Sequence, residues 1–134
     1  MNYLVDTNII SELARPMPNT GVLQWASQVQ RHSISAISVE EIGFGIARRP
    51  KATLQIWMEA YLQRHEILPV TETIAWRAGE LRGDLSKRGI TRLQADMLIA
   101  ATAQIQGLTL VTRNTRDFEG CGIGLLNPFT PDPP

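Results

Sequence analysis

Four acidic residues of this chain each fall where a predicted strand and a predicted helix meet. Asp6 follows the apolar run 3–5, and Glu41 lies in the first turn of the helix predicted after the second strand. Asp96 lies near the start of a later helix, and Asp117 comes shortly after the strand that follows it. In an open parallel sheet, ligands bind beyond the carboxyl ends of the strands. Such a fold would gather these four carboxylates at one edge.

Each acid taken singly also has a structural explanation. Three of them fit capping motifs at the start of a helix or turn. The pairs concerned are Asp6 with Asn8, Ser38 with Glu41, and Asn114 with Asp117. Asp96 is harder to explain in this way, because it interrupts the apolar segment 93–101 and a bare buried charge is very costly.

The four acids make more physical sense with a divalent cation than without one. Carboxylates packed together repel and raise one another's pKa values unless a cation neutralises them. Cys121 is the only cysteine, and the two histidines, His32 and His65, are expected to be surface or capping residues. An oxygen-only site is preferred by Mg²⁺ and Mn²⁺. The chemistry expected of it is metal-assisted hydrolysis of a phosphodiester.

The elements that must position these acids alternate between strand and helix, which predicts right-handed crossovers and a parallel sheet. We expect an α/β fold, a three-layer α/β/α sandwich around a mostly parallel central sheet of four to five strands. One domain should span residues 1–129, with a flexible tail over 130–134. The predicted strands are 3–5, 33–37, 66–70 and 108–111, with a short edge strand at 123–126. The predicted helices are 9–14, 21–30, 38–48, 52–64, 71–87 and 91–106, with Thr20, Ser38, Thr71 and Thr91 as N-terminal caps and Gly107 as a terminator.

Composition bounds the function only loosely. Thirteen basic residues balance thirteen acidic ones, which by itself argues against a generic nucleic-acid binder. Eleven of the basic residues are Arg, whose planar guanidinium suits carboxylates and phosphates. No apolar run approaches the ~18–20 residues of a membrane span. The expected location is the cytoplasm.

Four segments of the chain resemble PIN-domain ribonucleases, especially the VapC and FitB-type toxins of bacterial toxin–antitoxin pairs. Any one of these motifs is weak, but four in order at the family's spacing are specific. The resemblance extends from about residue 3 to residue 129, and the closing stretch 125–129 is also FitB-like. The four segments are Asp6-Thr7-Asn8, 38–45, 96–103 and 110–118.

The resemblance implies a PIN-like fold in which the four acids bind Mg²⁺ or Mn²⁺ and catalyse RNA cleavage. Polar neighbours would orient the carboxylates or water. Glu40 leaves a one-residue ambiguity; Glu41 is favoured by the family's spacing, and Glu40 would point about 100° away around the helix. Glu12 is expected on the helix surface or in a minor supporting role. The implied ligands are Asp6, Glu41, Asp96 and Asp117, and the supporting residues are Thr7, Asn8, Thr112 and Asn114.

The resemblance further implies a homodimer and inhibition by a cognate antitoxin protein, through which the complex would bind DNA. Four arginines near the acids are candidates for contacts with RNA phosphates, although exposed Arg on a helix is commonly only solvated. The alternative function is a non-catalytic PIN-fold interaction module that acts through a protein partner. The presence of all four acids argues against that alternative. The candidate arginines are Arg82, Arg92, Arg113 and Arg116.

Overall fold

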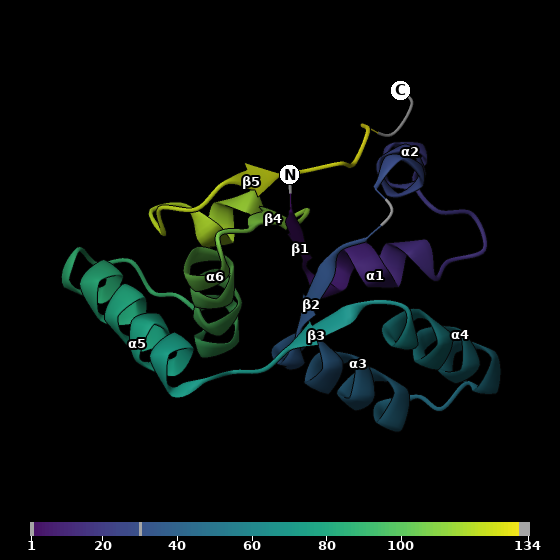
Figure 1. The fold of residues 1–134 in the computed structure, drawn as a ribbon, viewed down its shortest axis with the longest axis horizontal. Coiled ribbons are helices and arrows are strands. Elements are labelled where there is room, and N and C mark those ends of the chain that lie inside the picture. The colour runs from purple at the N-terminus through teal and green to yellow at the C-terminus, as the bar shows by residue number, and fades with distance from the viewer. Residues whose placement is uncertain (1, 30, 132–134) are drawn as a thin grey trace.

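The computed structural model describes residues 2–29 and 31–131 (Figure 1). The predicted helix end at Gln30 and the tail residues 132–134 lie outside this range. Along the described chain the strands are β1 Tyr3–Val5, β2 Ser33–Ser35, β3 Glu66–Leu68, β4 Thr109–Val111 and β5 Leu125–Leu126. The helices are α1 Thr7–Leu13, α2 Thr20–Gln28, α3 Ala36–Arg48, α4 Ala52–Gln63, α5 Glu72–Lys87 and α6 Gln94–Gln106, with a 3₁₀ turn, η1, at Thr115–Phe118.

The five strands form one parallel sheet in the order β3-β2-β1-β4-β5. The first strand of the chain is therefore its central strand, with Leu4 opposite Ser33 on one side and Leu110 on the other. Crossovers proceed outward from β1 to β2 and β3, and the chain then returns to the other side of β1 as β4. This reversal makes the carboxyl ends of β1 and β4 a topological switch point, where ligands bind in such sheets.

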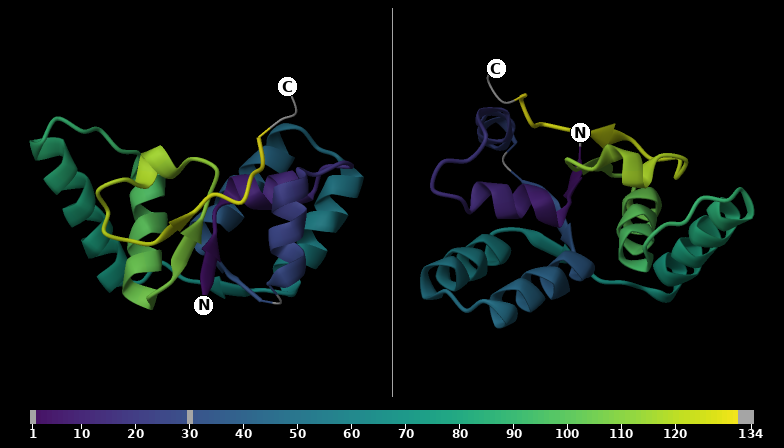
Figure 2. Two further views of the ribbon diagram at one scale, coloured as in Figure 1. Left: turned by 90° about the horizontal axis from the view of Figure 1, so that it is seen from above. Right: turned by 180° about the vertical axis from the view of Figure 1, so that it is seen from behind.

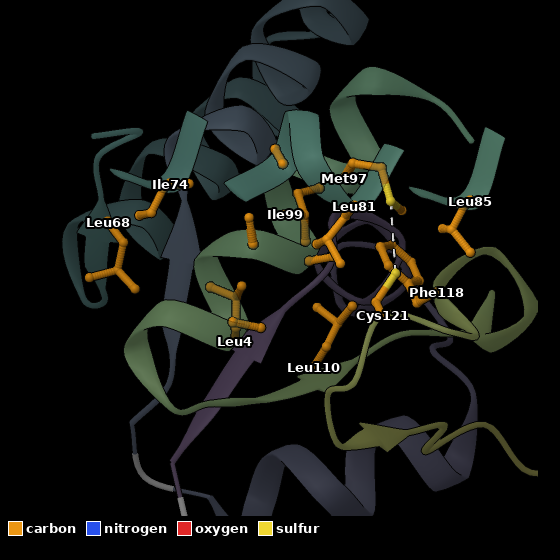
Figure 3. Close-up of a cluster of buried hydrophobic side chains, with 14 residues drawn as sticks. Leu4, Leu68, Ile74, Leu81, Leu85, Met97, Ile99, Leu110, Phe118 and Cys121 are labelled. Carbon is orange, nitrogen blue, oxygen red and sulfur yellow. Dashed lines mark hydrogen bonds between the residues drawn. The ribbon is translucent and has the colours of Figure 1, made fainter. Parts of the chain in front are cut away.

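Helices cover both faces of the sheet, which confirms the predicted three-layer arrangement (Figure 2). Successive side chains of a strand point to opposite faces. Leu4 and Leu110 accordingly pack into the apolar cluster beneath α5 and α6, and Val5 and Val111 pack into the cluster on the side of α1 to α4. In the first cluster the thiol of Cys121 lies 3.8 Å from the sulfur of Met97 (Figure 3).

Helix α3 begins earlier than predicted. Its N-cap is Ser35, whose hydroxyl oxygen accepts the backbone N–H of Ile37 at 3.1 Å. Strand β2 ends at Ser35, so the cap falls there and the predicted capping box of Ser38 with Glu41 is wrong. Both side chains are consequently available for contacts outside their own helix.

Of the other predicted helix ends, two are confirmed and two are wrong. Thr71 caps α5 through its side chain, and Gly107 ends α6 with a φ of 66°, both as predicted. Asn19 replaces Thr20 as the cap of α2, because its amide oxygen accepts two N–H groups of the first turn. The predicted cap at Thr91 is also wrong, since α6 begins at Gln94 without a side-chain cap.

The C-terminal segment is hydrogen-bonded to the N-terminus of α2. The backbone N–H and the hydroxyl of Thr130 both donate to Asn19 Oδ1, at 3.0 and 3.2 Å. A Cβ atom at Gly21 would lie 2.3 Å from the carbonyl oxygen of Pro128, so only glycine permits this approach. Thr130, the first residue of the predicted tail, is thus hydrogen-bonded to Asn19, and the flexibility of the tail stays a prediction.

His32 is buried, contrary to the prediction of a surface or capping role. It is 7% exposed, its Nε2 is hydrogen-bonded to the Tyr61 hydroxyl, and its ring stacks on His65 with centroids 3.9 Å apart. Burial lowers the pKa of His32 to about 3, so the ring is neutral near pH 7. It precedes β2, at the opposite end of the sheet from Asp6.

Among the described residues, no helix is long and apolar enough to cross a membrane.

Candidate functional site

A cleft of about 430 Å³ opens at the switch point between β1 and β4. Three of the four predicted acids line it, and the fourth, Asp117, lies on the exposed turn η1 close enough to raise the pKa of Asp6. Asp6, Glu41 and Asp96 thus share one cleft with Asp117 near it, and their role as metal ligands stays a prediction. The lining residues are Asp6, Thr7, Asn8, Ser11, Glu12, Arg15, Glu41, Asp96, Arg113, Asn114 and Phe129.

Asp6 is held on several sides. It is the N-cap of α1, and its Oδ1 accepts the Thr7 N–H at 2.8 Å. Its Oδ2 accepts the Thr112 hydroxyl at 2.8 Å and the Asn8 amide at 3.2 Å. Burial raises the pKa of Asp6, and these three hydrogen bonds oppose that rise because they favour the ionised form. Capping and a place in the cleft are therefore compatible roles for this residue.

Glu41, and not its neighbour, faces the other acids. Its Oε1 accepts the Thr7 hydroxyl at 2.7 Å, and its side chain is half-buried in the cleft. Glu40 is exposed and does not line the cleft. The geometry therefore separates two residues that the sequence left ambiguous.

Among the described residues, none donates a hydrogen bond to the carboxylate of Asp96 or Asp117. The two salt bridges among the described residues join Arg15 to Glu12 and Arg77 to Glu80, so neither acid is paired with a base. Burial raises the pKa of Asp96 to about 6, and repulsion from the other three site carboxylates adds to the rise. Asp96 is thus the acid on which the negative charges of the other three act.

The supporting residues join the ends of β1 and β4. Asn8 donates to Thr112 Oγ1 at 3.3 Å, and its Oδ1 accepts the N–H of Arg113 at 3.1 Å. Thr112, which is fully buried, also accepts the N–H of Asn114 at 3.0 Å. Asn114 was predicted as a polar neighbour that orients carboxylates or water, and the contact that it makes here is through its backbone N–H. The network fixes the switch point as a rigid frame around Asp6.

Two contributors escaped the sequence reasoning. Glu12 is 7% exposed rather than on the helix surface, because its Oε2 accepts the N–H of Asn19 at 2.8 Å and its Oε1 pairs with Arg15. Ser38 is fully buried, and its Oγ lies 2.9 Å from Thr7 Oγ1. A helical spacing of three residues from Glu41 was the available signal for Ser38, but it had been assigned to capping.

A family model described as "PIN domain" matches residues 3–121. The chain belongs to the PIN-domain family. This PIN domain is 34% identical to the toxin FitB of Neisseria gonorrhoeae, over 94% of this chain and 97% of that one. It is 31% identical to the VapC ribonuclease Y4jK of Sinorhizobium fredii, over 96% and 98%. Among solved structures it is similar to VapBC2 from Rickettsia felis bound to a DNA fragment from their promoter, with a TM-score of 0.84, 27% identity, and 95% and 98% of the two chains covered. The predicted resemblance to VapC and FitB is confirmed.

The four candidate arginines of this PIN domain are not equivalent. Arg113 lines the cleft, with its guanidinium 4.5 Å from the centre of the Phe129 ring. Arg92 donates at 3.2 Å to a backbone carbonyl of the loop after η1 and partly offsets the raised pKa of Asp96. Arg82 and Arg92 line a separate hollow of about 490 Å³. Arg116 is exposed on η1.

The donor chemistry of the site fits a hard divalent cation. The cleft offers carboxylate, hydroxyl and amide oxygens, and the free thiol of Cys121 is buried in the core beneath α5 and α6. The carboxylates do not yet surround a common point. No group of three or more His, Cys, Asp or Glu side chains among the described residues is arranged to hold an ion. Asp6 and Glu41 are already held by hydrogen bonds, whereas the carboxylates of Asp96 and Asp117 accept none among the described residues.

Proposed function

We propose that this PIN domain is a Mg²⁺- or Mn²⁺-dependent endoribonuclease and the toxin of a toxin–antitoxin pair. One observation carries the proposal: three of the four carboxylates line the switch-point cleft, and repulsion from Asp6, Asp117 and Glu41 adds to burial in raising the pKa of Asp96 to about 6. A divalent cation would remove that repulsion. The names of the similar proteins, a toxin and a ribonuclease, support the same reading.

We assign the metal to Asp6, Glu41, Asp96 and Asp117. Once bound, the ion would polarise the scissile phosphate and lower the pKa of an attacking water. Asp6 supplies a fixed carboxylate because its orientation is set by three hydrogen bonds. Thr7 donates a hydrogen bond to one oxygen of Glu41, and Asp96 and Asp117 supply carboxylates that accept no hydrogen bond among the described residues. Thr112 and Asn8 support Asp6, and the backbone of Asn114 supports Thr112.

We propose that RNA phosphates contact arginines on both sides of the cleft. Arg113 is the strongest candidate, because its stack on Phe129 holds the guanidinium beside the acids. Arg92 and Arg82 would extend the contact along the neighbouring hollow, and Arg116 along η1. A net charge of zero is compatible with RNA binding: if the four acids are set aside, thirteen basic residues face nine acidic ones.

The proposed partner is a cognate antitoxin, with DNA contacted only through it, and the proposed setting is a cytoplasmic homodimer. The similar structure from Rickettsia felis is VapBC2 bound to a DNA fragment from their promoter, which supports a protein partner and DNA. Large apolar side chains on the surface of this chain are consistent with covered faces, for example Trp76, at 75% exposure, and Phe44, at 61%. A non-catalytic interaction module is the less favoured function, because such a module has no need of three acids in one cleft with a fourth beside it.

The proposal is tested with the purified chain, freed of any partner, on RNA with Mg²⁺ or Mn²⁺. Cleavage should require the metal and should be lost in Asp6→Asn and in Asp96→Asn. Glu41→Gln and Glu40→Gln form a matched pair on one helix, and only Glu41→Gln should lose activity. Cleavage without metal, or wild-type activity in both aspartate variants, would contradict the mechanism.

A further inference from the structure

Arg15 follows the C-terminus of α1 and lines the acidic cleft together with Asp6, Glu41 and Asp96. The four arginines that the sequence predicts as RNA contacts do not include it. Arg113 is the other basic residue among the described residues that line the cleft. Two guanidinium groups therefore border the acids.

A salt bridge to Glu12 orients the Arg15 guanidinium. Arg15 Nη1 donates to Glu12 Oε1 at 3.2 Å, and the backbone N–H of Arg15 donates to the Glu12 carbonyl oxygen at 3.1 Å. Glu12 is itself held, because it is 7% exposed and its Oε2 accepts the N–H of Asn19 at 2.8 Å. A salt bridge to a side chain that is already fixed loses less conformational entropy than one between two mobile side chains. The guanidinium therefore has a preferred position beside the cleft.

Most of the hydrogen-bonding capacity of Arg15 is unused. A guanidinium carries five N–H donors. Among the described residues, Glu12 is the one hydrogen-bond partner of the Arg15 side chain, which is 66% exposed. Planar N–H donors of this kind match phosphate oxygens and bind them more strongly than neutral donors do. Arg15 thus has a fixed contact on one side and donors for a phosphate on the others.

The C-terminal segment connects the two arginines of the cleft. Glu12 binds the backbone N–H of Asn19, and Asn19 Oδ1 in turn accepts the backbone N–H of Thr130 at 3.0 Å. The preceding residue, Phe129, lies against the Arg113 guanidinium, 4.5 Å from the centre of the ring. Both guanidinium groups are therefore positioned by one continuous set of contacts.

We propose that Arg15 binds a phosphate of the RNA strand that enters the cleft, and that Arg113 binds a second one. Every nucleotide of RNA carries a phosphate, so a strand that crosses the acids presents successive phosphates to the two arginines. Glu12 is then a positioning residue, because it touches Arg15 and not the RNA. The inference rests on the proposed ribonuclease function. The competing explanation is that Arg15 only neutralises the buried carboxylate of Glu12.

The decisive variant replaces both members of the salt bridge, Glu12→Gln together with Arg15→Ala. It removes one acid and one base, so the net charge of the chain is unchanged, and the glutamine amide oxygen can still accept the Asn19 N–H. Arg15→Ala alone would leave a buried carboxylate without its base and lower the stability of the fold. The matched control is Glu80→Gln together with Arg77→Ala, the other salt bridge among the described residues, which lies on α5 outside the cleft.

The test measures binding of a fluorescein-labelled single-stranded oligouridylate to the partner-free full chain, in Mg²⁺ and at several salt concentrations. All proteins compared carry Asp96→Asn, which prevents cleavage. The paired variant at Glu12 and Arg15 should weaken binding by roughly 3- to 10-fold. It should also reduce the slope of log affinity against log salt by about 0.7, the value for one phosphate contact on a single strand. Arg15→Lys keeps the charge but not the planar donors, so it should keep the slope and lose part of the affinity. The control pair should change neither quantity.

Two failures can be told apart. If the wild type does not cleave RNA with Mg²⁺ or Mn²⁺, the proposed function is wrong. If it does cleave, but the paired variant at Glu12 and Arg15 binds with unchanged affinity and salt slope, Arg15 only neutralises Glu12 and the inference is overturned. The same holds if the control pair on α5 reduces the slope equally, since the effect would then not belong to the cleft. Cleavage by the wild type with no salt-dependent binding by the Asp96→Asn chain would also contradict the phosphate contact.

Discussion

The two halves of the acidic cleft are built in opposite ways. On the side of β1 and α3, Asp6 accepts three hydrogen bonds and Glu41 accepts one. On the side of α6 and η1, the carboxylates of Asp96 and Asp117 accept none among the described residues and make no salt bridge. The first half is held by the protein. The second half has charge without a partner.

This difference indicates that the two halves of the cleft have different roles. A carboxylate fixed by donors keeps its orientation whether or not a ligand is present, whereas an unpaired one is destabilising until a cation arrives. The raised pKa of Asp96 reports that cost directly. The helix N-terminus near Asp96 lessens the cost only slightly. A positive ion would therefore stabilise the folded state most on the side of Asp96 and Asp117.

The largest test replaces one acid in each half. Asp6→Asn and Asp96→Asn should each reduce RNA cleavage by more than about 100-fold, yet shift stability in opposite directions. Asp6→Asn removes acceptors from buried donors and should destabilise by about 1–3 kcal/mol. Asp96→Asn removes an unpaired charge and should stabilise the metal-free protein by roughly 1 kcal/mol at pH 7, after allowance for solvent screening of a half-exposed group. Urea unfolding without metal measures both, and a destabilised Asp96→Asn would refute the contrast.

A slightly smaller effect is expected from Thr112→Val, which tests the held half. The change keeps the shape of a fully buried side chain but removes a donor to Asp6 and the acceptor of the Asn114 N–H. The loss should be about 1–2 kcal/mol in the free energy of unfolding. Thr102→Val is the control, because the Thr102 hydroxyl, equally buried, bonds only to Leu98 O within α6. Equal losses would mean that Asp6 is not held by Thr112.

The pH dependence of stability should identify the unpaired half. The pKa of Asp96 is raised to about 6, so between about pH 4 and pH 6 the folded chain binds more protons at this site than the unfolded chain. The stability of the wild type should therefore fall, relative to Asp96→Asn, as the pH rises through that window, by roughly 1 kcal/mol after screening. Unfolding curves of both proteins at several pH values give the difference. With saturating Mn²⁺ the fall should vanish, and an unchanged difference across the window would contradict the assignment.

The smallest effect concerns the counter-charge of the unpaired half. Arg92 is the base that lowers the pKa of Asp96, and Arg92→Ala should raise that pKa further. The cost in stability should be only a few tenths of a kcal/mol, as expected for a screened pair. Carboxyl carbon resonances followed by NMR titration would report it. Arg77→Ala, which removes a base paired with Glu80, should leave Asp96 unaffected.

The fold and the convergence of the acids were predictable because both follow from chain order. Alternating strands and helices require a parallel sheet, and residues placed just after strands must meet at its carboxyl edge. Asp6 and Thr112 illustrate this, since they follow the adjacent strands β1 and β4. Glu41 could not be separated from Glu40 by sequence alone, since the choice depends on the rotation of α3 about its axis.

The remaining errors concern which of several similar polar residues finds a given partner. Ser35 and Ser38 are equally good caps by type, and the end of β2 decides between them. The burial of Glu12 depends on the loop that returns to Asn19, and that of His32 on Tyr61 of α4. These contacts join segments whose relative placement is set by tertiary packing. Local sequence does not determine that placement.

The position of β1 bears on when this protein acquires an active cleft during its synthesis. Residues 3–5 are made before the other four strands, but they become the central strand only when β4 pairs with them. The bond from Thr112 to Asp6 spans 106 positions of sequence, and Asp96 and Asp117 also belong to the last third of the chain. Contacts between such distant residues cannot form until both have been made. A nascent chain that ends before β4 lacks Thr112 and Asp117 and therefore cannot assemble the complete site.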